Sequence, residues 1–273
     1  MHRQEVLLMI TKFYISTSAD FSYSYEDPDD IGPSAPLAAE NGMGLELAEY
    51  CITYNIDDNF ENTDRLIRKR MTYTDDVLFH APYNELCPAA IDPMIREVAK
   101  KRYLQVFPLA EKYGAKKIVV HSGFDPMLYR REWFIPESTA FWKDVLKALP
   151  DGIIMTLENV MEPDPEITKG VVEAVCDPRF KLCLDIGHAN LMPAPVSEWI
   201  KVFGDDLSHL HVHNNDGPVN NGIAAAGDKH LAPGNGVMDV KALLESVRVP
   251  VTATLETQQI REAVDWVKNV YEA

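Results

Sequence analysis

Short apolar segments alternate with longer amphipathic segments along most of this chain, and this alternation narrows the folds open to it more than any other feature. Several of the apolar segments contain almost no polar residue, as expected for parallel strands that are buried on both faces. They predict eight strands, at residues 13–17, 44–48, 77–80, 117–121, 153–158, 181–185, 207–211 and 251–256. The segments between these strands must then supply the layer that covers the sheet.

Those connecting segments predict helices, at residues 93–113, 136–149, 166–175, 196–203, 240–247 and 261–270. The first has Asp92 as an N-cap before Pro93, and Gly114 follows where a glycine often ends a helix. Strand–helix alternation predicts a parallel α/β fold, and eight units in 273 residues match a (β/α)8 TIM barrel. A doubly wound sheet is the alternative, but it usually carries a glycine-rich turn after the first strand, and none is present.

The chain is expected to form a single domain over residues 1–273, with residues 1–10 as a flexible leader. Its 46% hydrophobic and 25% charged residues are ordinary for a globular protein with a sizeable core. The apolar run at residues 6–10 is too short for a signal peptide or a membrane span. The four cysteines lack the spacing of a metal or disulfide framework, so we expect reduced thiols and a cytoplasmic location.

The charge balance bears on the partners of the protein. There are 26 Lys and Arg residues against 42 Asp and Glu residues, a formal net charge of −16. A net charge this acidic argues against unaided binding of nucleic acid, although bound metal ions can restore positive charge locally. We therefore expect a small-molecule partner rather than nucleic acid or a membrane, and self-association into a homo-oligomer stays open.

The predicted strands end in an unusual set of residues. Six successive strands end in a histidine or a carboxylate: His80, His121, Glu158, Asp185, His211 and Glu256. In a barrel the C-terminal ends of the strands form one rim, which is where active sites lie. So many ionisable groups at one rim would repel each other or stay unpaired unless a cation joined them. The pattern predicts a metal site.

Three more residues of ligand type, His188, Asp228 and His230, follow the later strands. Imidazole and carboxylate ligands suit zinc, manganese, cobalt or iron, and the absence of thiolates argues against a structural zinc knot. Taken singly, each residue has another explanation, and Asp185 alone could be a helix N-cap. Along the seventh strand we expect His209 to pack deeper in the barrel and His213 to support the ligands from behind.

The chain resembles a known group of barrels at a series of short motifs. These are His80-Ala-Pro-Tyr83, Val120-His121-Ser-Gly123, Leu157-Glu158-Asn159, Asp185-Ile-Gly-His188, His211-Val-His-Asn-Asn-Asp216-Gly217, Asp228-Lys-His230 and Leu255-Glu256-Thr257. In this order they are similar to the xylose isomerase-like superfamily. That superfamily contains sugar and sugar-phosphate isomerases and epimerases, and also endonuclease IV. The resemblance implies the same barrel and a divalent-metal site at its rim.

Two branches of the superfamily imply different ligand sets. The epimerases imply one divalent ion held by Glu158, Asp185, His211 and Glu256. Endonuclease IV implies three zinc ions held by nine residues: His80, His121, Glu158, Asp185, His188, His211, Asp228, His230 and Glu256. Departures from both branches are present, since residues 84–88 and 49–55 do not match the DNA-contacting segments of the endonuclease. The arginine that some epimerases carry after the seventh-strand histidine is replaced by Gly217 and Pro218.

Two reaction classes follow. The first is isomerisation or epimerisation of a small sugar or sugar phosphate through an enediolate, with Glu158 and Glu256 exchanging the proton on carbon. The alternative is a phosphoesterase of the endonuclease IV type with several zinc ions, which explains the additional histidines better. Either requires zinc or manganese, at one to three ions per chain. A barrel that only binds a ligand is a third class, and the complete ligand set argues against it.

Several residues near the predicted rim are candidates for substrate binding. Aromatic and basic side chains in the predicted loop 122–136 could cap a sugar or grip a phosphate. The alternative is that the same residues form a helix or an oligomer contact. The complete set of candidates is Tyr83, Asn159, His188, Arg130, Trp133 and Lys229.

Overall fold

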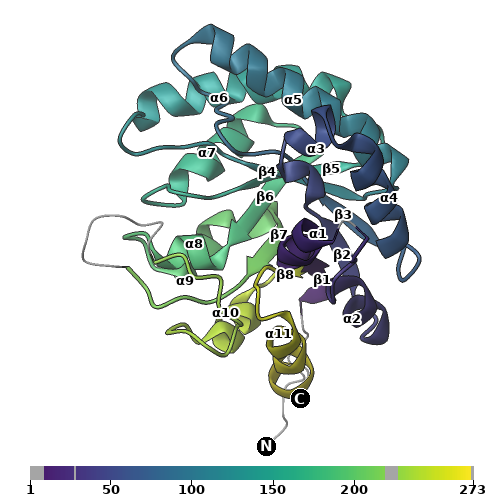
Figure 1. Cartoon of the computed structure of the whole chain (residues 1–273). Helices are drawn as coiled ribbons and strands as arrows, with labels where there is room; N and C mark the ends of the chain where they lie inside the picture. Colours follow the sequence, from purple (N-terminus) through teal and green to yellow (C-terminus); the bar gives the residue numbers. More distant parts are fainter. Residues whose placement is uncertain (1–8, 28, 219–226, 272–273) are drawn as a thin grey trace, which may run out of the picture.

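The computed structural model describes residues 9–27, 29–218 and 227–271. Eight parallel strands pair in chain order and close into a barrel, which confirms the predicted (β/α)8 fold (Figure 1). The strands are β1 Ile10–Ser16, β2 Gly44–Leu47, β3 Val77–His80, β4 Lys117–His121, β5 Ile154–Glu158, β6 Phe180–Asp185, β7 Leu207–Val212 and β8 Val251–Leu255. The barrel closes where β1 pairs with β8. Most of the predicted leader, residues 1–8, lies outside the described residues.

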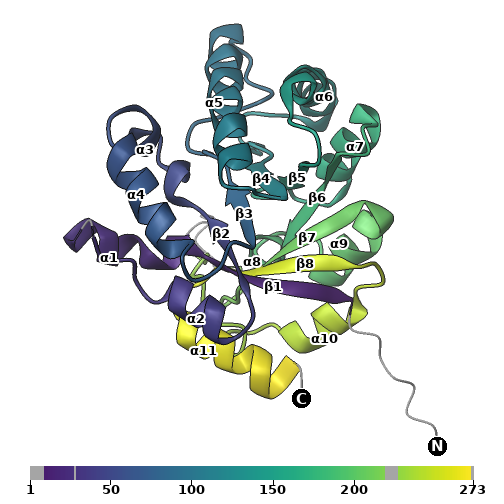
Figure 2. The same ribbon diagram turned by 90° about the vertical axis from the view of Figure 1, so that its right-hand side faces the viewer.

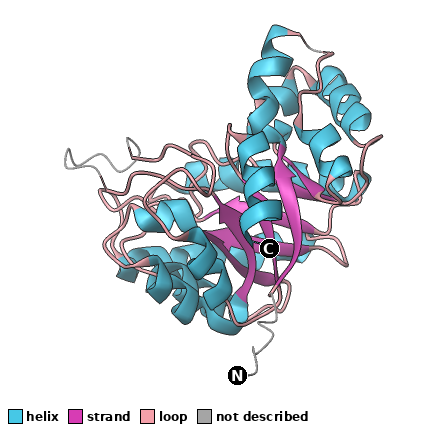
Figure 3. Ribbon diagram, turned by 90° about the horizontal axis from the view of Figure 1, so that it is seen from below, coloured by secondary structure: helices cyan, strands magenta, loops and turns pink. Residues whose placement is uncertain are grey.

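The helices surround this barrel in chain order (Figure 2) and the strands lie inside them (Figure 3). They are α1 Phe21–Glu26, α2 Ser34–Glu40, α3 Tyr54–Asp57, α4 Phe60–Arg70, α5 Pro93–Lys112, α6 Arg131–Val145, α7 Glu166–Val175, α8 Ile186–Asn190, α9 Val196–Phe203, α10 Val240–Ser246 and α11 Ile260–Trp266. The Asp92 side chain accepts a hydrogen bond from Met94 N at 2.8 Å, as its predicted N-cap role requires. Among the described helices, none combines the length and the apolar character of a membrane span.

One helix begins earlier than predicted. α6 begins at Arg131, so Pro136 lies inside the helix, and the predicted loop over residues 122–136 ends at Arg130. A proline is disfavoured there, because its ring removes one backbone hydrogen bond. The helix forms because its buried residues, Phe134, Ser138, Phe141 and Trp142, repeat at helical spacing across the proline.

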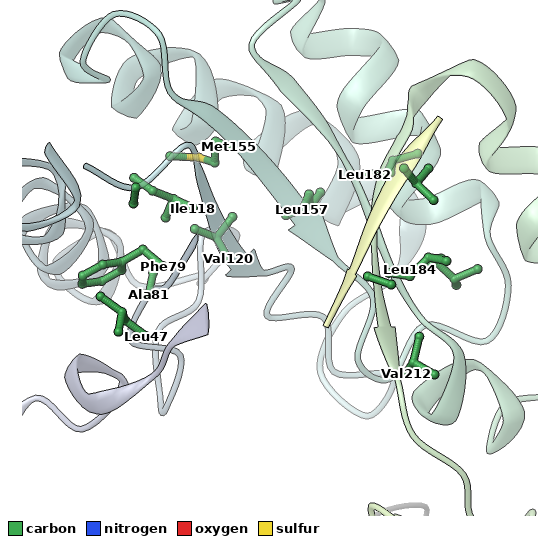
Figure 4. Packing of buried hydrophobic residues seen from close by; sticks show 14 of the residues in the cluster. Leu47, Phe79, Ala81, Ile118, Val120, Met155, Leu157, Leu182, Leu184 and Val212 are labelled. Carbon is green, nitrogen blue, oxygen red and sulfur yellow. The ribbon is translucent and has the colours of Figure 1, made fainter. Parts of the chain in front are cut away.

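Along each strand, side chains alternate between the helix layer and the barrel interior. The outward-facing residues are apolar and pack against the helices, and Figure 4 shows many of them, among them Phe79, Val120 and Leu157. The inward-facing residues therefore include Glu46, His80, His121, Glu158, Cys183, Asp185, His209 and His211. Apolar packing on one face thus fixes which polar residues share the barrel interior.

A separate charged group is buried beside the first two strands. Arg70, the last residue of α4, is fully buried. Its guanidinium contacts the Glu49 carboxylate, and its Nη2 lies 3.4 Å from Asp20 Oδ2. Since an unpaired buried charge is costly, this group ties α4 to the segments after β1 and β2.

Candidate metal centre

The nine residues predicted as ligands fall into three adjoining clusters at the C-terminal rim of the barrel. In each cluster the candidate ligand atoms lie within 4.8 Å of one another. The first cluster is His80, His121 and Glu158; the second is Glu158, Asp185, His211 and Glu256; and the third is His188, His213, Asp228 and His230. The third cluster contains His213 in addition to the predicted residues.

Glu158 belongs to two clusters because its two carboxylate oxygens face different neighbours. Its Oε2 lies 3.4 Å from His80 Nε2 and 3.3 Å from His121 Nε2. Its Oε1 lies 3.2 Å from His211 Nδ1. The carboxylate is fully buried at the end of β5. Glu158 is thus placed to bridge two neighbouring ions.

The second cluster gathers around one ring nitrogen of His211. Its Nδ1 lies 2.8 Å from Glu256 Oε2 and 3.9 Å from Asp185 Oδ2. Asp185 also caps α8, because its Oδ1 accepts a hydrogen bond from His188 N at 2.7 Å. The N-cap role and a place in the cluster therefore belong to the same side chain.

Hydrogen bonds to main-chain carbonyls set which histidine nitrogen faces each cluster. His80 Nδ1 lies 2.9 Å from Ala81 O, His188 Nδ1 lies 3.0 Å from Asn159 O, and His230 Nδ1 lies 3.0 Å from Glu256 O. A carbonyl can only accept, so each Nδ1 carries a proton and the neutral ring keeps its lone pair on Nε2. This is how histidine ligands are usually oriented around a metal ion.

The electrostatics show how strongly these groups depend on one another. Burial alone would raise the pKa of Glu256, yet the neighbouring His211 imidazole lowers it to about 2. Burial likewise works against charge on His230, but the Asp228 carboxylate and Glu256 raise the pKa of His230 to about 9. Without a metal, the proton on His230 thus helps to balance the carboxylates, and a divalent cation would take its place.

These residues fit a divalent ion. Two ligand atoms about 2.0–2.1 Å from a tetrahedral zinc ion stand about 3.3 Å apart. The contacts of Glu158 with His80, His121 and His211 measure 3.2–3.4 Å. In the part of the chain that the structure describes, neither Glu158 Oε2 nor Asp228 Oδ1 has a hydrogen-bond donor. Buried acceptors without donors are costly, and a cation would satisfy them.

Sequence reasoning missed Glu46, a buried glutamate of β2. Its Oε1 lies 3.0 Å from His211 Nε2, the ring nitrogen that faces away from the second cluster. Its Oε2 lies 3.1 Å from His209 Nε2 and accepts a hydrogen bond from Thr254 Oγ1 at 2.6 Å. The available signal was a single glutamate in the middle of an otherwise apolar strand.

The predicted substrate-binding residues are found in different surroundings. Tyr83 stacks on the His121 ring with centroids 4.2 Å apart, and 37% of its surface is exposed at the mouth. Asn159 uses both ends of its amide to bind the main chain of Asp185. Trp133 donates to Ala89 O at 3.0 Å.

The two cationic candidates are exposed. Arg130 lies directly before α6, and the Lys229 ammonium pairs with the Asp216 carboxylate. His188 is itself a member of the third cluster. Tyr83 is thus the candidate best placed to meet a substrate at the first cluster.

A cavity of about 440 Å³ opens beside the first cluster. Most of its lining is apolar or aromatic, and it includes Tyr83, Leu86, His121, Leu128, Tyr129 and Met161. Volumes of this order suit small organic ligands. The cavity therefore places space for a small molecule directly against a candidate metal ligand.

A family model described as xylose isomerase-like TIM barrel matches residues 37–270. The chain belongs to this family. Among curated relatives, the uncharacterised protein MJ1311 of Methanocaldococcus jannaschii is 25% identical over 218 residues, which is 75% of this chain and 72% of that protein. A probable endonuclease 4 of Ureaplasma parvum is 23% identical over 208 residues, 70% of this chain and 67% of that protein.

Several solved structures superpose on nearly the whole chain. The TTHB071 protein from Thermus thermophilus, from a crystal soaked with ZnCl2, has a TM-score of 0.73 at 22% identity and covers 96% of this chain and 98% of its own. A D-tagatose 3-epimerase-like protein has a TM-score of 0.75 at 22% identity, with 96% of each chain covered. At this identity the likeness shows the fold. The predicted family is confirmed.

Proposed function

We propose that this protein is a divalent-metal-dependent hydrolase of small phosphate esters that works with two or three ions at the barrel rim. The observation that carries the proposal is the position of Glu158 between two clusters, with one oxygen toward His80 and His121 and the other toward His211. A shared carboxylate is what two neighbouring ions require, and two-metal sites of this kind are typical of phosphoryl hydrolysis.

The same geometry weakens the enediolate reaction. A glutamate that moves a proton on and off carbon needs one oxygen free to approach the substrate. Glu158 is fully buried: its Oε1 lies 3.2 Å from His211 Nδ1, and its Oε2 faces the ring nitrogens of His80 and His121 at 3.3–3.4 Å, so neither oxygen is open to a substrate. Glu158 therefore serves better as a fixed bridge than as a mobile base.

In the proposed reaction the residues of this chain hold the ions, orient the substrate and exclude bulk water. Bound divalent ions would supply positive charge for phosphate oxygens and lower the pKa of the attacking water. His80 and His121 would hold the ion of the first cluster, and Tyr83 covers one face of the His121 ring. The cavity beside them accommodates the organic part of the ester and keeps bulk water away from it.

The charges of the clusters favour binding of a phosphate at this rim, and the net charge of the chain favours a small substrate. The clusters contain four carboxylates, from Glu158, Asp185, Asp228 and Glu256, so three divalent ions would leave an excess of positive charge. The rest of the surface is acidic, since the whole chain carries −16. A local positive centre on an acidic protein attracts a small phosphate but gives no extended contact with a nucleic-acid backbone.

The test measures how fast the metal-loaded protein hydrolyses two substrates. One is a phosphodiester, bis(p-nitrophenyl) phosphate, and the other is a phosphomonoester, p-nitrophenyl phosphate. Glu158→Gln should lower the rate at least about 100-fold, because it removes the bridge. Glu162→Gln is the matched control: Glu162 is also fully buried and follows the same strand, and its carboxylate accepts from Val160 N at 2.7 Å. It should stay within about threefold of wild type.

A second candidate is isomerisation or epimerisation of a small sugar. The cavity beside His121 favours it, and so does the D-tagatose 3-epimerase-like protein that shares the fold. Ketoses, aldoses and their phosphates, together with abasic-site DNA, therefore belong in the same assay panel. Interconversion of a sugar without hydrolysis of any ester would overturn the proposal in favour of this candidate. Cleavage of abasic DNA alone would refute the small-substrate part.

A further inference from the structure

The cavity beside the first cluster lies between two segments that hydrogen bonds tie together. Cys87 Sγ lies 3.3 Å from Gly123 O and 3.1 Å from the Tyr129 hydroxyl, within hydrogen-bond reach of both. Trp133 in α6 donates to Ala89 O at 3.0 Å. The segment after β3 is thus joined to the segment after β4 and to α6, and these contacts fix the walls of the cavity.

The two segments approach closely because residue 123 is a glycine. Gly123 has φ of +71°, in the left-handed region that favours glycine. A Cβ atom on Gly123 would stand 2.9 Å from Leu86 O and 2.9 Å from Pro88 Cδ, closer than carbon atoms normally approach. Any side chain at this position would therefore push residues 86–88 away and reshape the cavity that Leu86 lines.

The buried part of the cavity lining is apolar. Leu86, Ala90 and Phe124 line the cavity, and each exposes 6% of its surface or less. Asn84 and Glu85 also line it, but both are exposed, at its outer edge. A molecule that enters the cavity therefore meets carbon atoms on the inside and polar groups near the solvent.

The exposed edge of the cavity has apolar side chains as well. Ile95 and Leu128 line the cavity, with 46% and 64% of their surfaces exposed. Exposed apolar groups that surround a cavity are typical of a ligand-binding site. An apolar ligand would cover part of both side chains and continue the apolar lining outward.

The charges of the lining differ between its two ends. His121 belongs both to the lining and to the first cluster, so a phosphate held by an ion of that cluster would lie at this end. Elsewhere the lining contains the carboxylates of Glu85 and Asp125, and none of the described residues that line it is Lys or Arg. A second negative group would therefore be repelled in the cavity, with no cationic side chain to receive it.

We propose that this cavity binds the organic group of the phosphate ester and selects an apolar group without negative charge, such as an aryl or branched alkyl group. The volume of about 440 Å³ would also suit a sugar. A sugar has hydroxyls on every side, however, and burying them against carbon atoms is unfavourable. This inference rests on the proposed function, because it places the phosphate at the ion of the first cluster.

The test is isothermal titration calorimetry of the metal-loaded, full-length protein with four phosphonates, which keep the phosphate shape but cannot be hydrolysed. The probes are methylphosphonate, phenylphosphonate, 4-carboxyphenylphosphonate and a glucose C-phosphonate. Phenylphosphonate should bind at least about 30-fold more tightly than methylphosphonate, because its ring leaves water for an apolar lining. Its binding should also have a more negative heat-capacity change.

The other two probes test charge and polarity. The added carboxylate should weaken binding of the phenyl compound at least about tenfold, because Glu85 and Asp125 repel it. The glucose compound should bind within about threefold of methylphosphonate, since its hydroxyls offset the gain from its carbon atoms. A parallel assay compares hydrolysis of methyl and phenyl p-nitrophenyl phosphate, which share one leaving group. The phenyl ester should have the higher kcat/KM, again by at least about 30-fold.

Leu128→Ala should lower the preference for phenyl over methyl about fivefold, because it removes apolar surface from the lining. Met127→Ala is the matched control, since Met127 is the preceding residue and 89% of it is exposed, but it does not line the cavity. It should leave the preference unchanged. Gly123→Ala should also lower the preference, through displacement of Leu86. Circular dichroism of each variant shows whether it folds.

Equal binding of phenylphosphonate and methylphosphonate would overturn the inference, and so would tighter binding of the glucose compound or no binding of any probe. An equal loss of preference in Met127→Ala and Leu128→Ala would overturn the assignment to this cavity. The calorimetry does not depend on turnover. A phenyl preference without ester hydrolysis would therefore support the cavity site and refute the hydrolase, whereas hydrolysis of both esters at equal rates would do the reverse.

Discussion

Glu46 offers the sharpest test of how the barrel interior supports the metal centre. It is fully buried, and its Oε1 lies 3.0 Å from the ring nitrogen of His211 that faces away from the second cluster. Burial alone would keep it neutral, but His211 and His209 hold its pKa well below the ordinary value. The carboxylate is therefore ionised, and it holds His211 in the orientation that turns Nδ1 toward Glu158 and Glu256.

Glu46→Gln preserves the shape of the side chain and removes its charge. An amide can still accept from Thr254 Oγ1, so we expect the fold to persist. Loss of an orienting carboxylate behind a metal-bound histidine typically weakens metal binding 10–100-fold, which is about 1.4–2.8 kcal/mol. The loss should fall on the ion of the second cluster, because that ion is the one that His211 would hold. The third cluster shares no residue with the Glu46 contacts described above and should keep its affinity.

The assay is competition with a chromogenic chelator for zinc, at constant pH, with the ions counted per chain. Thr254→Val is the control, because it removes one hydrogen bond from Glu46 but leaves its charge and its contact with His211. It should change affinity by less than about threefold. A change below about threefold in Glu46→Gln, or an equal loss at every ion, would refute the role assigned to Glu46.

Three further predictions concern stability. Arg70→Met should lower the free energy of unfolding by about 3–5 kcal/mol in urea titrations, because it leaves the Glu49 carboxylate buried without its partner; a loss below about 1 kcal/mol would contradict this. Burial lowers the pKa of His209 from 6.5 to about 4, so its stabilising effect is complete above pH 6.5 and is lost as the pH falls. The stability difference between wild type and His209→Gln should therefore shrink by about 1.4 kcal/mol per pH unit between pH 6.5 and pH 4, and a constant difference would contradict it. Removal of metal with EDTA should lower the melting temperature by at least about 5 °C, and an unchanged value would show that the ions do not stabilise the fold.

The fold was predictable wherever an apolar run had clear ends. The predicted bounds 77–80 and 117–121 are those of β3 and β4, because each run begins after charged or turn residues and ends in a histidine. α6 was predicted poorly at its start, since Pro136 resembles a first helical residue. Packing of Phe134 and Trp142 outweighed the cost of the proline, and that balance depends on tertiary contacts.

The part of the candidate site that lies at the ends of the strands was predictable from the sequence. Residues at the ends of six strands share a rim in any closed barrel, so their proximity follows from the fold. Glu46 lies within β2, and its role depends on the pairing of strands far apart in the chain, which brings it to His211. His213 was expected to stand behind the ligands; its Nε2 lies 3.0 Å from Asp185 Oδ1, and its Nδ1 lies 4.0 Å from Asp228 Oδ1. That orientation depends on the room left by Gly187, which no spacing rule contains.

The three clusters are completed at different chain lengths, and this would set the order in which a growing chain could bind the proposed ions. The first cluster needs residues only up to Glu158, the third needs His230, and the second needs Glu256 just beyond β8. The strand pairing that closes the barrel joins Ile15 to Leu255, 240 positions apart. Because synthesis proceeds from the N-terminus, the first ion site is complete in sequence while the last strands are still unmade. Binding of the proposed ions and closure of the barrel would thereby be linked in time, because Glu158 belongs to both the earliest and the latest cluster to be completed.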